Sequence, residues 1–125
     1  MKDMLKIAVK AADDKKASDI VVLDISKIAS FTDHFLICSG ESSRQIQAIA
    51  DEVERALREK GVRPSHIEGY RNAEWVLLDY IDMVVHIFSK NARSFYDLER
   101  LWRDAQPLDA QKLLKARSTK RTAKK

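Results

Sequence analysis

The sequence contains few residues that cross-link or interrupt a chain: its 125 residues include one cysteine, three glycines and two prolines. A single cysteine excludes an internal disulfide framework and a zinc site made only of cysteines. The scarcity of glycine and proline argues against a low-complexity chain. No apolar run approaches the roughly 18 residues of a membrane span, and the charged start MKDMLKIAVKAADDKK lacks the apolar core of a secretory signal. We therefore expect one soluble, cytoplasmic domain without a membrane partner.

Residues 38–51, CSGESSRQIQAIAD, form a glycine–serine turn that leads into a helix, an arrangement that can bind phosphate. The turn lacks both the Walker pattern and the three glycines of a dinucleotide site. It resembles the turn of nucleotidyltransferases, but the acids that follow, Asp51 and Glu52, are helical neighbours and not a metal-binding pair on a strand. Ser42 and Gln45 match a capping box. Structural capping is therefore the favoured interpretation, with anion contact as the alternative.

Cys38, His86 and Asp79 are the residue types of a nucleophile, a base and an orienting acid. Cys38, however, lies within the apolar run HFLICS, where a buried cysteine is the ordinary outcome. The three histidines show no spacing typical of metal ligands. We therefore expect no catalytic residues, no metal and no cofactor. A nucleotide-binding enzyme related to nucleotidyltransferases is the alternative.

Charge is divided unevenly along the chain. The whole sequence carries 23 basic and 19 acidic residues, but residues 111–125 hold seven of the basic residues and no acid. The remainder has 16 basic against 19 acidic residues, a net charge of −3. We expect a folded domain over residues 1–106 and a basic, disordered tail over residues 107–125. The tail is a candidate for weak, salt-sensitive contact with RNA, including ribosomal RNA.

Apolar periodicity predicts the order of the elements. The predicted helices cover residues 2–16, 43–60 and 92–105. The predicted strands cover residues 19–24, 34–39, 65–69, 74–79 and 83–88. The inward positions of the second helix are Ile46, Ile49, Ala50, Val53 and Leu57. The resulting order, α-β-β-α-β-β-β-α, predicts an α/β fold in which helices cover a mixed sheet.

The strands over residues 74–79 and 83–88 should form a hairpin with Tyr80, Ile81 and Asp82 in the turn. Alternation makes both faces of this hairpin largely apolar. Either both faces are covered inside the domain, or one face is an exposed patch with an acidic rim, suited to a basic partner. An exposed face would also suit a homodimer of the free protein. The anchors of that patch would be Trp75, Leu77 and Met83, and its rim Asp79, Tyr80 and Asp82.

Four stretches in this order, SGESSRQIQAIAD, the EG at 68–69, EWVLLDYIDMVVHIF and RSFYDLERLW, resemble the bacterial ribosomal silencing factor (Iojap) family. The resemblance runs from about residue 4 to residue 104 and leaves only the basic tail outside. Ile81 stands where the family commonly has the glycine of a Tyr-Gly-Asp turn. Because a β-branched residue disfavours positive φ, we do not expect that backbone conformation at Ile81.

The resemblance implies a nucleotidyltransferase-like α/β fold that lacks the catalytic acids, and a role that is not enzymatic. It implies binding to ribosomal protein L-fourteen on the large ribosomal subunit. This binding would block association with the small subunit and repress translation under nutrient limitation. The mildly acidic domain has the sign of charge that a basic ribosomal protein would attract. The residues implied to contact the partner are Trp75, Leu78, Asp79, Tyr80 and Met83 of the hairpin, with Arg44 and Glu68.

Overall fold

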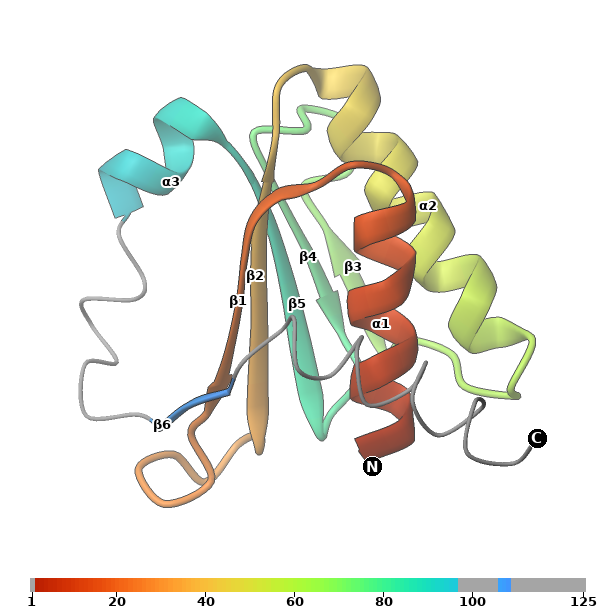
Figure 1. Ribbon diagram of the computed structural model, residues 1–125, viewed down its shortest axis with the longest axis vertical. Coiled ribbons are helices and arrows are strands. Elements are labelled where there is room, and N and C mark those ends of the chain that lie inside the picture. Colours follow the sequence, from red (N-terminus) through yellow and green to blue (C-terminus); the bar gives the residue numbers. More distant parts are fainter. Residues whose placement is uncertain (1, 97–105, 109–125) are drawn as a thin grey trace, which may run out of the picture.

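The computed structural model describes residues 2–96 and 106–108, and the structural statements below concern that part of the chain (Figure 1). Its helices are α1 (Lys2–Asp14), α2 (Ser43–Arg58) and α3 (Lys90–Tyr96). Its strands are β1 (Ser18–Asp24), β2 (His34–Gly40), β3 (His66–Glu68), β4 (Trp75–Asp79), β5 (Met83–Ser89) and β6 (Gln106–Leu108).

The strands form one mixed sheet in the order β3-β4-β5-β2-β1-β6. The central strands β2 and β5 run parallel, with His34 opposite Met83 and Gly40 opposite Ser89. The other neighbouring strands are antiparallel. The parallel pair requires a crossover, and α2 lies within the segment that connects β2 to β5. The α/β fold with a mixed sheet, predicted from the sequence, is therefore confirmed.

Helices α1 and α2 lie side by side on one face of the sheet, and α3 lies on the other face (Figure 1). The five inward positions predicted for α2 are all buried. Each large aliphatic side chain that is buried here contributes about 1.5–3 kcal/mol. The main core is formed jointly by this helix layer and the sheet beneath it. On the sheet side, that core includes Leu36, Val76, Leu78, Val85 and Ile87.

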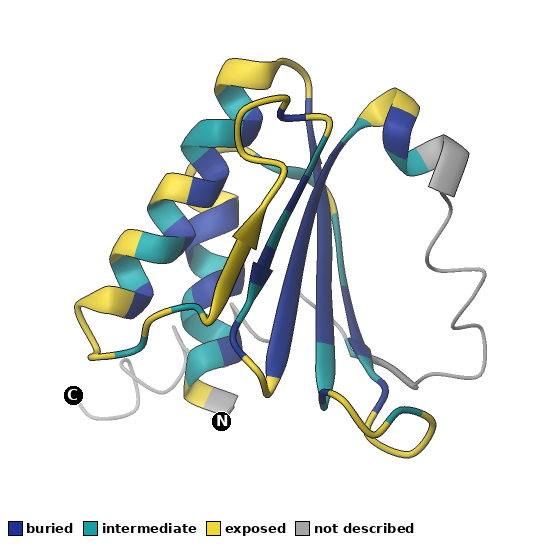
Figure 2. Cartoon of the chain, turned by 180° about the vertical axis from the view of Figure 1, so that it is seen from behind, coloured by how far each residue is buried: buried dark blue, intermediate teal, exposed yellow. Residues whose placement is uncertain are grey.

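The two faces of the β4–β5 hairpin are covered unequally. β5 is buried along nearly its whole length, whereas β3 at the edge is exposed (Figure 2). In β4, Val76 and Leu78 are buried toward the helices, while Trp75, Leu77 and Asp79 are half-buried on the opposite face. β5 is therefore covered on both faces, whereas β4 is covered on the helix side and only partly covered on the other, where Trp75 and Leu77 pack against a second core cluster.

The C-terminal part of the fold differs from the prediction. The last predicted helix, over residues 92–105, begins at Lys90, and its residues 97–105 lie outside the described part of the chain. Strand β6 was not predicted, and it pairs with β1 at the edge of the sheet. The sheet therefore extends to Leu108, past the domain end expected at residue 106.

The start of α2 confirms the predicted cap. The Ser42 hydroxyl accepts a hydrogen bond from the Gln45 amide at 3.1 Å. The Gln45 side chain reaches back to the amide of Glu41, at 2.6 Å, and not to the amide of Ser42 as expected. Its Nε2 atom also donates to the carbonyl oxygens of Lys15 and Lys16. One side chain therefore closes the N-terminus of α2 and fixes the end of α1 beside it.

The β4–β5 turn is shorter than the three-residue loop that was expected. The Tyr80 amide donates to the Met83 carbonyl at 2.8 Å, so these residues close a two-residue loop of Ile81 and Asp82. Ile81 has a φ of 72°, and the expectation that it would avoid positive φ is wrong. Its amide donates to Asp79 Oδ1 at 2.8 Å, which holds the turn in place. Glycine is the usual first residue of two-residue loops with this sign of φ.

We expect Ile81→Gly to raise the free energy of unfolding by about 1 kcal/mol, because glycine relieves the cost of positive φ. The Ile81 side chain is 63 % exposed, so little packing is lost. Urea denaturation followed by circular dichroism measures the change. Ile67→Gly is the matched control, since Ile67 is 43 % exposed and has no positive φ. The control should lose stability, and a similar loss in Ile81→Gly would contradict strain at the turn.

Candidate docking surface

On the face away from α1 and α2, the edge strand β3 and its neighbour β4 present a row of partly exposed side chains. The two strands pair so that His66 lies opposite Asp79 and Glu68 lies opposite Leu77. Residues opposite one another in an antiparallel pair share a face. The β3 residues are exposed and the β4 residues are half-buried. We call His66, Glu68, Trp75, Leu77 and Asp79 the β3–β4 surface.

The β3–β4 surface places apolar area among acidic side chains. Glu68 and Asp79 belong to it, and the exposed Glu74 and Asp82 lie beyond the two ends of β4. His66 Nδ1 lies 3.9 Å from Asp79 Oδ2, which forms an ion pair only when His66 is protonated. The surface therefore places acidic side chains around a half-buried indole. This combination suits a basic protein partner, because complementary charge steers and orients docking.

Trp75 is held at two points by the neighbouring strand β5. Its indole stacks on Phe88, with ring centroids 5.0 Å apart and an interplanar angle of 27°. Its Nε1–H donates a hydrogen bond to His86 Nδ1 at 3.1 Å. Phe88 lies directly opposite Trp75 in the register, and His86 is the diagonal neighbour two residues away. The aromatic anchor is therefore fixed in orientation while part of it stays accessible.

His86 is 4 % exposed, and burial lowers its pKa to about 4, so the ring is neutral at physiological pH. Because Nδ1 accepts the hydrogen bond from Trp75, the ring proton lies on Nε2. No hydrogen-bond partner of Nε2 is found within the described part of the chain. Phe35 packs edge-on against the ring, with centroids 4.5 Å apart. The imidazole is thus a buried acceptor among aromatic side chains.

The buried imidazole predicts an acid-sensitive fold. The pKa of His86 is lowered from 6.5 to about 4 in the folded state, so the unfolded chain binds the proton more readily between these values. Stability should therefore fall as the pH drops through this window, by about 2–3 kcal/mol between neutral pH and about pH 4.5. Urea denaturation at both pH values measures the fall. His86→Phe should show a shallower pH dependence, and an unchanged dependence would contradict the assignment to His86.

Three of the residues implied to bind the partner are buried on the other side of the sheet. Leu78, Tyr80 and Met83 are 1, 6 and 1 % exposed and belong to the core beneath α1 and α2. The expectation that Met83 shares an exposed patch with Trp75 is wrong. A two-residue loop directs Tyr80 and Met83 toward the helices, because successive strand residues alternate between faces. These three side chains support the hairpin from beneath.

Trp75, Asp79 and Glu68, which the resemblance also implied, come together on the β3–β4 surface. Arg44 does not join them. It is exposed in the first turn of α2, which packs on the opposite face of the sheet. The set implied by the resemblance therefore divides into three surface residues, three buried residues and one residue in the helix layer.

The contact between His86 and Trp75 was not predicted from the sequence. The register pairs Leu77 with His86, and this pairing follows from the two-residue loop at the hairpin tip. A three-residue loop shifts the register by one position and moves His86 to the other face. Knowing the length of the turn would have identified the contact between His86 and Trp75. Ile81, at a position where glycine is usual, hid the two-residue turn.

The structure separates the residues of the catalytic alternative. Cys38 is fully buried in the core under α1 and α2, and burial raises its pKa to about 12. His86 faces the other side of the sheet, because the register pairs it with Ile37 and pairs Cys38 with Ile87. Within residues 2–96 and 106–108, no three His, Cys, Asp or Glu residues are grouped so that they could hold a metal ion. Cys38 and His86 therefore cannot act together as nucleophile and base.

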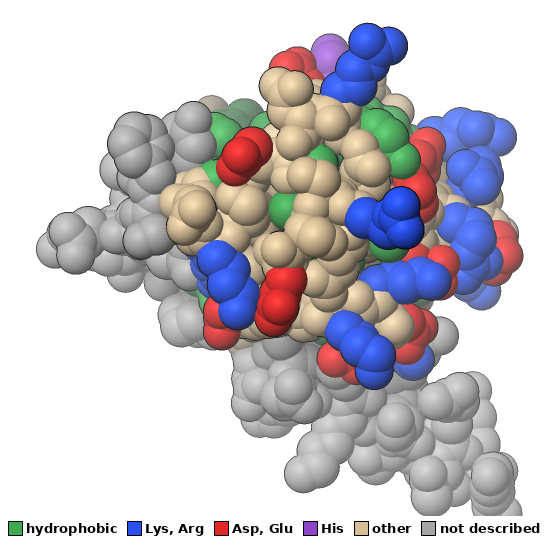
Figure 3. All heavy atoms as spheres, turned by 90° about the horizontal axis from the view of Figure 1, so that it is seen from above, with side chains coloured by type: hydrophobic (Ala, Val, Ile, Leu, Met, Phe, Trp, Pro, Cys, Tyr) green, Lys and Arg blue, Asp and Glu red, His purple; other side chains and the backbone are tan. Residues whose placement is uncertain are grey.

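The glycine of the glycine–serine turn packs against the first turn of α2. A Cβ atom added at Gly40 would lie 2.8 Å from Cγ1 of Ile46, so this glycine allows α2 to approach the end of β2. Seen from this end of the molecule, basic and acidic side chains are interspersed (Figure 3). Close packing and mixed charge favour the structural interpretation of the turn over phosphate binding.

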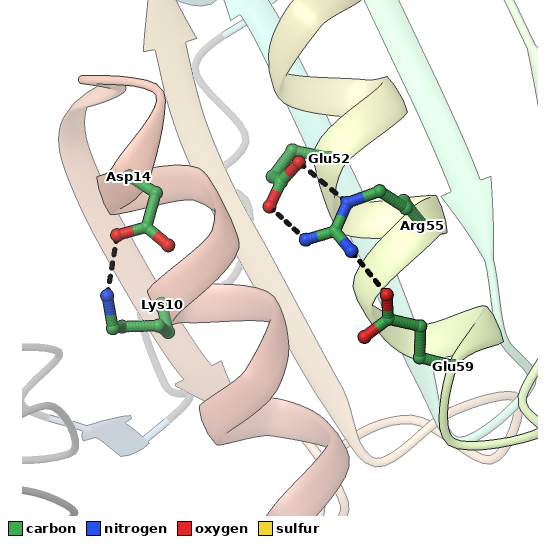
Figure 4. Close-up of polar contacts among 5 residues, drawn as sticks. All are labelled: Lys10, Asp14, Glu52, Arg55 and Glu59. Atoms are coloured by element: carbon green, nitrogen blue, oxygen red, sulfur yellow. Dashed lines mark hydrogen bonds and ion pairs between the residues drawn. The ribbon is translucent and has the colours of Figure 1, made fainter.

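The outward face of the helix layer carries charges that pair with one another (Figure 4). Lys10 contacts Asp14 at 2.6 Å, and Arg55 contacts both Glu52 and Glu59 at 2.6 Å. The hydrogen bond from Arg55 lowers the pKa of Glu52. Exposed pairs of this kind contribute little to stability. Because charges of both signs are neutralised locally, this face selects a partner less well than the β3–β4 surface.

Comparison with known proteins identifies the family. A family model described as "ribosomal silencing factor during starvation" matches residues 1–125. The chain belongs to the family of ribosomal silencing factors. This membership confirms the resemblance seen in the four sequence stretches. By that description, members of this family silence ribosomes during starvation. Within the described residues, no helix has both the length and the apolar character to cross a membrane.

Two curated ribosomal silencing factors are similar over most of their length. The protein of Bacillus subtilis (strain 168) is 49 % identical over 108 residues, which cover 86 % of this chain and 92 % of that protein. The protein of Halalkalibacterium halodurans is 46 % identical over 107 residues, with the same coverage. A solved structure of a Chromobacterium violaceum protein superposes with a TM-score of 0.80 at 39 % identity, covering 82 % of this chain and 85 % of that one. The fold is therefore shared with a solved protein of similar sequence.

Proposed function

We propose that this protein binds ribosomal protein L-fourteen on the large ribosomal subunit and blocks association with the small subunit. In this way it represses translation in the cytoplasm as a stress response to nutrient limitation. The observation that carries the proposal is the family match over residues 1–125, because the family's description names ribosomal silencing during starvation. The half-exposed Trp75 within an acidic surface supports the choice of a basic protein as the partner.

The proposed contact is the β3–β4 surface. Tryptophan is the residue type most often found at the energetic centre of an interface, and Trp75 lies among Leu77 and the acidic side chains of Glu68 and Asp79. The net charge of −3 over residues 1–110 has the sign that a basic ribosomal protein attracts. Leu78, Tyr80 and Met83 contribute by holding β4 and the turn in place from the core side.

The proposed mechanism is steric and needs no chemistry. A stable protein–protein contact buries roughly 800 Å² on each partner. A domain of this size bound in the path of the small subunit prevents joining as long as it stays bound. The repression therefore depends on occupancy, and its strength follows the affinity for the large subunit and the concentration of the protein.

Binding assays test the proposal directly. The purified protein should co-sediment with isolated large subunits and should bind isolated L-fourteen in calorimetry. Binding to the large subunit without binding to L-fourteen would contradict the choice of partner. Binding to neither would contradict the proposed function.

An inactive nucleotidyltransferase-like fold is part of the proposal, and a nucleotide-binding enzyme is its alternative. The side-chain cap of α2 supports inactivity, because Ser42 and Gln45 already occupy the amides of Gln45 and Glu41 in the turn that would receive phosphate. Calorimetry with nucleoside triphosphates and Mg²⁺ distinguishes the two. We expect no Mg²⁺-dependent heat, and saturable binding would favour the enzyme.

The basic tail lies outside the described residues, and we propose that it adds only weak contact with ribosomal RNA. The sheet reaches Leu108, so the docking domain should extend at least to that residue. Deletion of residues 111–125 should barely change co-sedimentation with large subunits at physiological salt. Loss of binding on this deletion would instead favour a direct RNA binder.

We also propose that the β3–β4 surface allows a homodimer of the free protein. The half-buried Trp75 and Leu77 would be the shared contacts, so dimerisation and ribosome binding would compete. Analytical ultracentrifugation of the wild type and Trp75→Ala tests this. A dimer that persists unchanged in the variant would place the dimer contact elsewhere.

A further inference from the structure

We propose that His86 is a positioning residue for ribosome docking: it accepts the indole N–H of Trp75 and holds the ring in the orientation that meets the partner. This inference rests on the proposed function, because the docking that it serves is the proposed contact at the β3–β4 surface. His86 itself is too deeply buried to touch a partner, and it acts through Trp75.

The geometry gives the indole two constraints that act on different parts of the ring. Stacking on Phe88, with centroids 5.0 Å apart, fixes the plane of the ring. The hydrogen bond to His86 Nδ1, at 3.1 Å, fixes the direction in which the N–H edge points. The stacking contact with Phe88 does not by itself distinguish the flipped ring, because both faces of an indole are apolar. The hydrogen bond distinguishes the two orientations.

The chemistry at position 86 is otherwise unfavourable to the fold. The imidazole lies among Phe35, Phe88 and the indole, where an apolar ring would avoid the desolvation cost of a polar one. Its Nε2–H has no acceptor within the described residues, which adds the cost of an unmade hydrogen bond. The favourable polar contact that the ring makes there is the one to Trp75. His86 therefore lowers the stability of the fold. Its hydrogen bond to Trp75 explains why a histidine occupies this position beneath the docking surface.

Holding the indole in place strengthens binding because an anchor that is already ordered loses less freedom on association. Loss of one such hydrogen bond should weaken affinity for the large subunit about fivefold. A lowered pKa at the imidazole agrees with this role, since the neutral ring keeps its acceptor at physiological pH.

Two substitutions at His86 separate positioning from packing. His86→Phe keeps an aromatic ring and removes the acceptor, whereas His86→Asn places a carbonyl oxygen near the position of Nδ1 and loses the ring. If the residue only fills space, the phenylalanine variant should bind large subunits better than the asparagine variant. Positioning predicts the reverse order: affinity about fivefold weaker for phenylalanine and within about twofold of wild type for asparagine.

A second comparison uses Trp75→Phe, which removes the indole N–H and keeps an aromatic anchor. In this background, His86→Phe should cause no further loss of affinity. In the free protein, the indole N–H signal in nuclear magnetic resonance reports the hydrogen bond directly, and Trp75→Phe identifies which signal belongs to Trp75. His86→Phe should shift that signal and speed its exchange with water.

The outcomes distinguish this inference from the function on which it rests. An indole signal unchanged by His86→Phe, or an equal loss of affinity in both backgrounds, would overturn the positioning role. If the wild-type protein does not bind large subunits, the proposed function and the docking role of His86 fail together. In that case the resonance measurement still shows whether the hydrogen bond exists in the free protein.

Discussion

Trp75→Ala is expected to weaken binding to large ribosomal subunits by at least about thirtyfold, enough to abolish co-sedimentation. The substitution removes the half-buried indole at the start of β4 and leaves Leu77 as the apolar side chain beside Glu68 and Asp79 on the β3–β4 surface. Co-sedimentation at several protein concentrations measures the loss. Circular dichroism and urea denaturation check that the domain remains folded.

Ile67→Ala is the matched control for this prediction. Ile67 lies on β3 and is 43 % exposed, but its partner in the register is Leu78, so it belongs to the opposite face of the sheet. The control should bind as the wild type does. If both variants lose binding equally, the contact is not confined to the proposed face. If Trp75→Ala unfolds the domain, Trp75 is a core residue and the surface assignment is wrong.

Gly69→Ala is expected to be the most destabilising of the substitutions considered, with a loss of more than about 3 kcal/mol. Gly69 has a φ of 77°, and a Cβ atom there would lie 2.1 Å from the carbonyl oxygen of Trp75. Backbone atoms cannot yield to this contact as a side chain can. The start of β4 would have to move, and the Trp75 anchor would move with it.

Gly61→Ala is the control that distinguishes the steric clash expected at Gly69 from the energetic cost of a positive φ. Gly61 has nearly the same φ, 79°, but nothing lies within 4 Å of an added Cβ. Its substitution should cost only about 1 kcal/mol. Urea denaturation of both variants gives the two values, and co-sedimentation should be lost only for Gly69→Ala. Equal losses of stability would contradict the close approach of the loop after β3 to Trp75.

The sequence predicted the first two helices well, because one periodic signal determines both their existence and their buried face. All five inward positions of α2 are buried, and Ser42 caps the helix as its spacing predicted. The strands were predicted from short apolar runs. Their order in the sheet was not, because pairing between β2 and β5 depends on contacts far apart in the sequence.

The candidate site was predicted less completely, because the length of the loop between β4 and β5 was not predicted correctly. A difference of one residue in loop length decides which face Met83 and His86 occupy. Ile81 in a conformation typical of glycine concealed the two-residue loop. As a result, the sequence placed Trp75 and Asp79 on one face of the hairpin, as the structure does, while the contact of His86 with Trp75 required the register. The proposed function came from the family resemblance, since a mechanism of steric inhibition, as proposed, would leave no catalytic motif in the sequence.

A subunit reassociation assay tests the central claim most directly. Purified large and small subunits are mixed at a magnesium concentration that permits joining, with and without excess protein, and separated on a sucrose gradient. Wild-type protein should keep the large subunit in the free peak, and Trp75→Ala should not. Unchanged joining in the presence of excess folded wild-type protein would contradict the account.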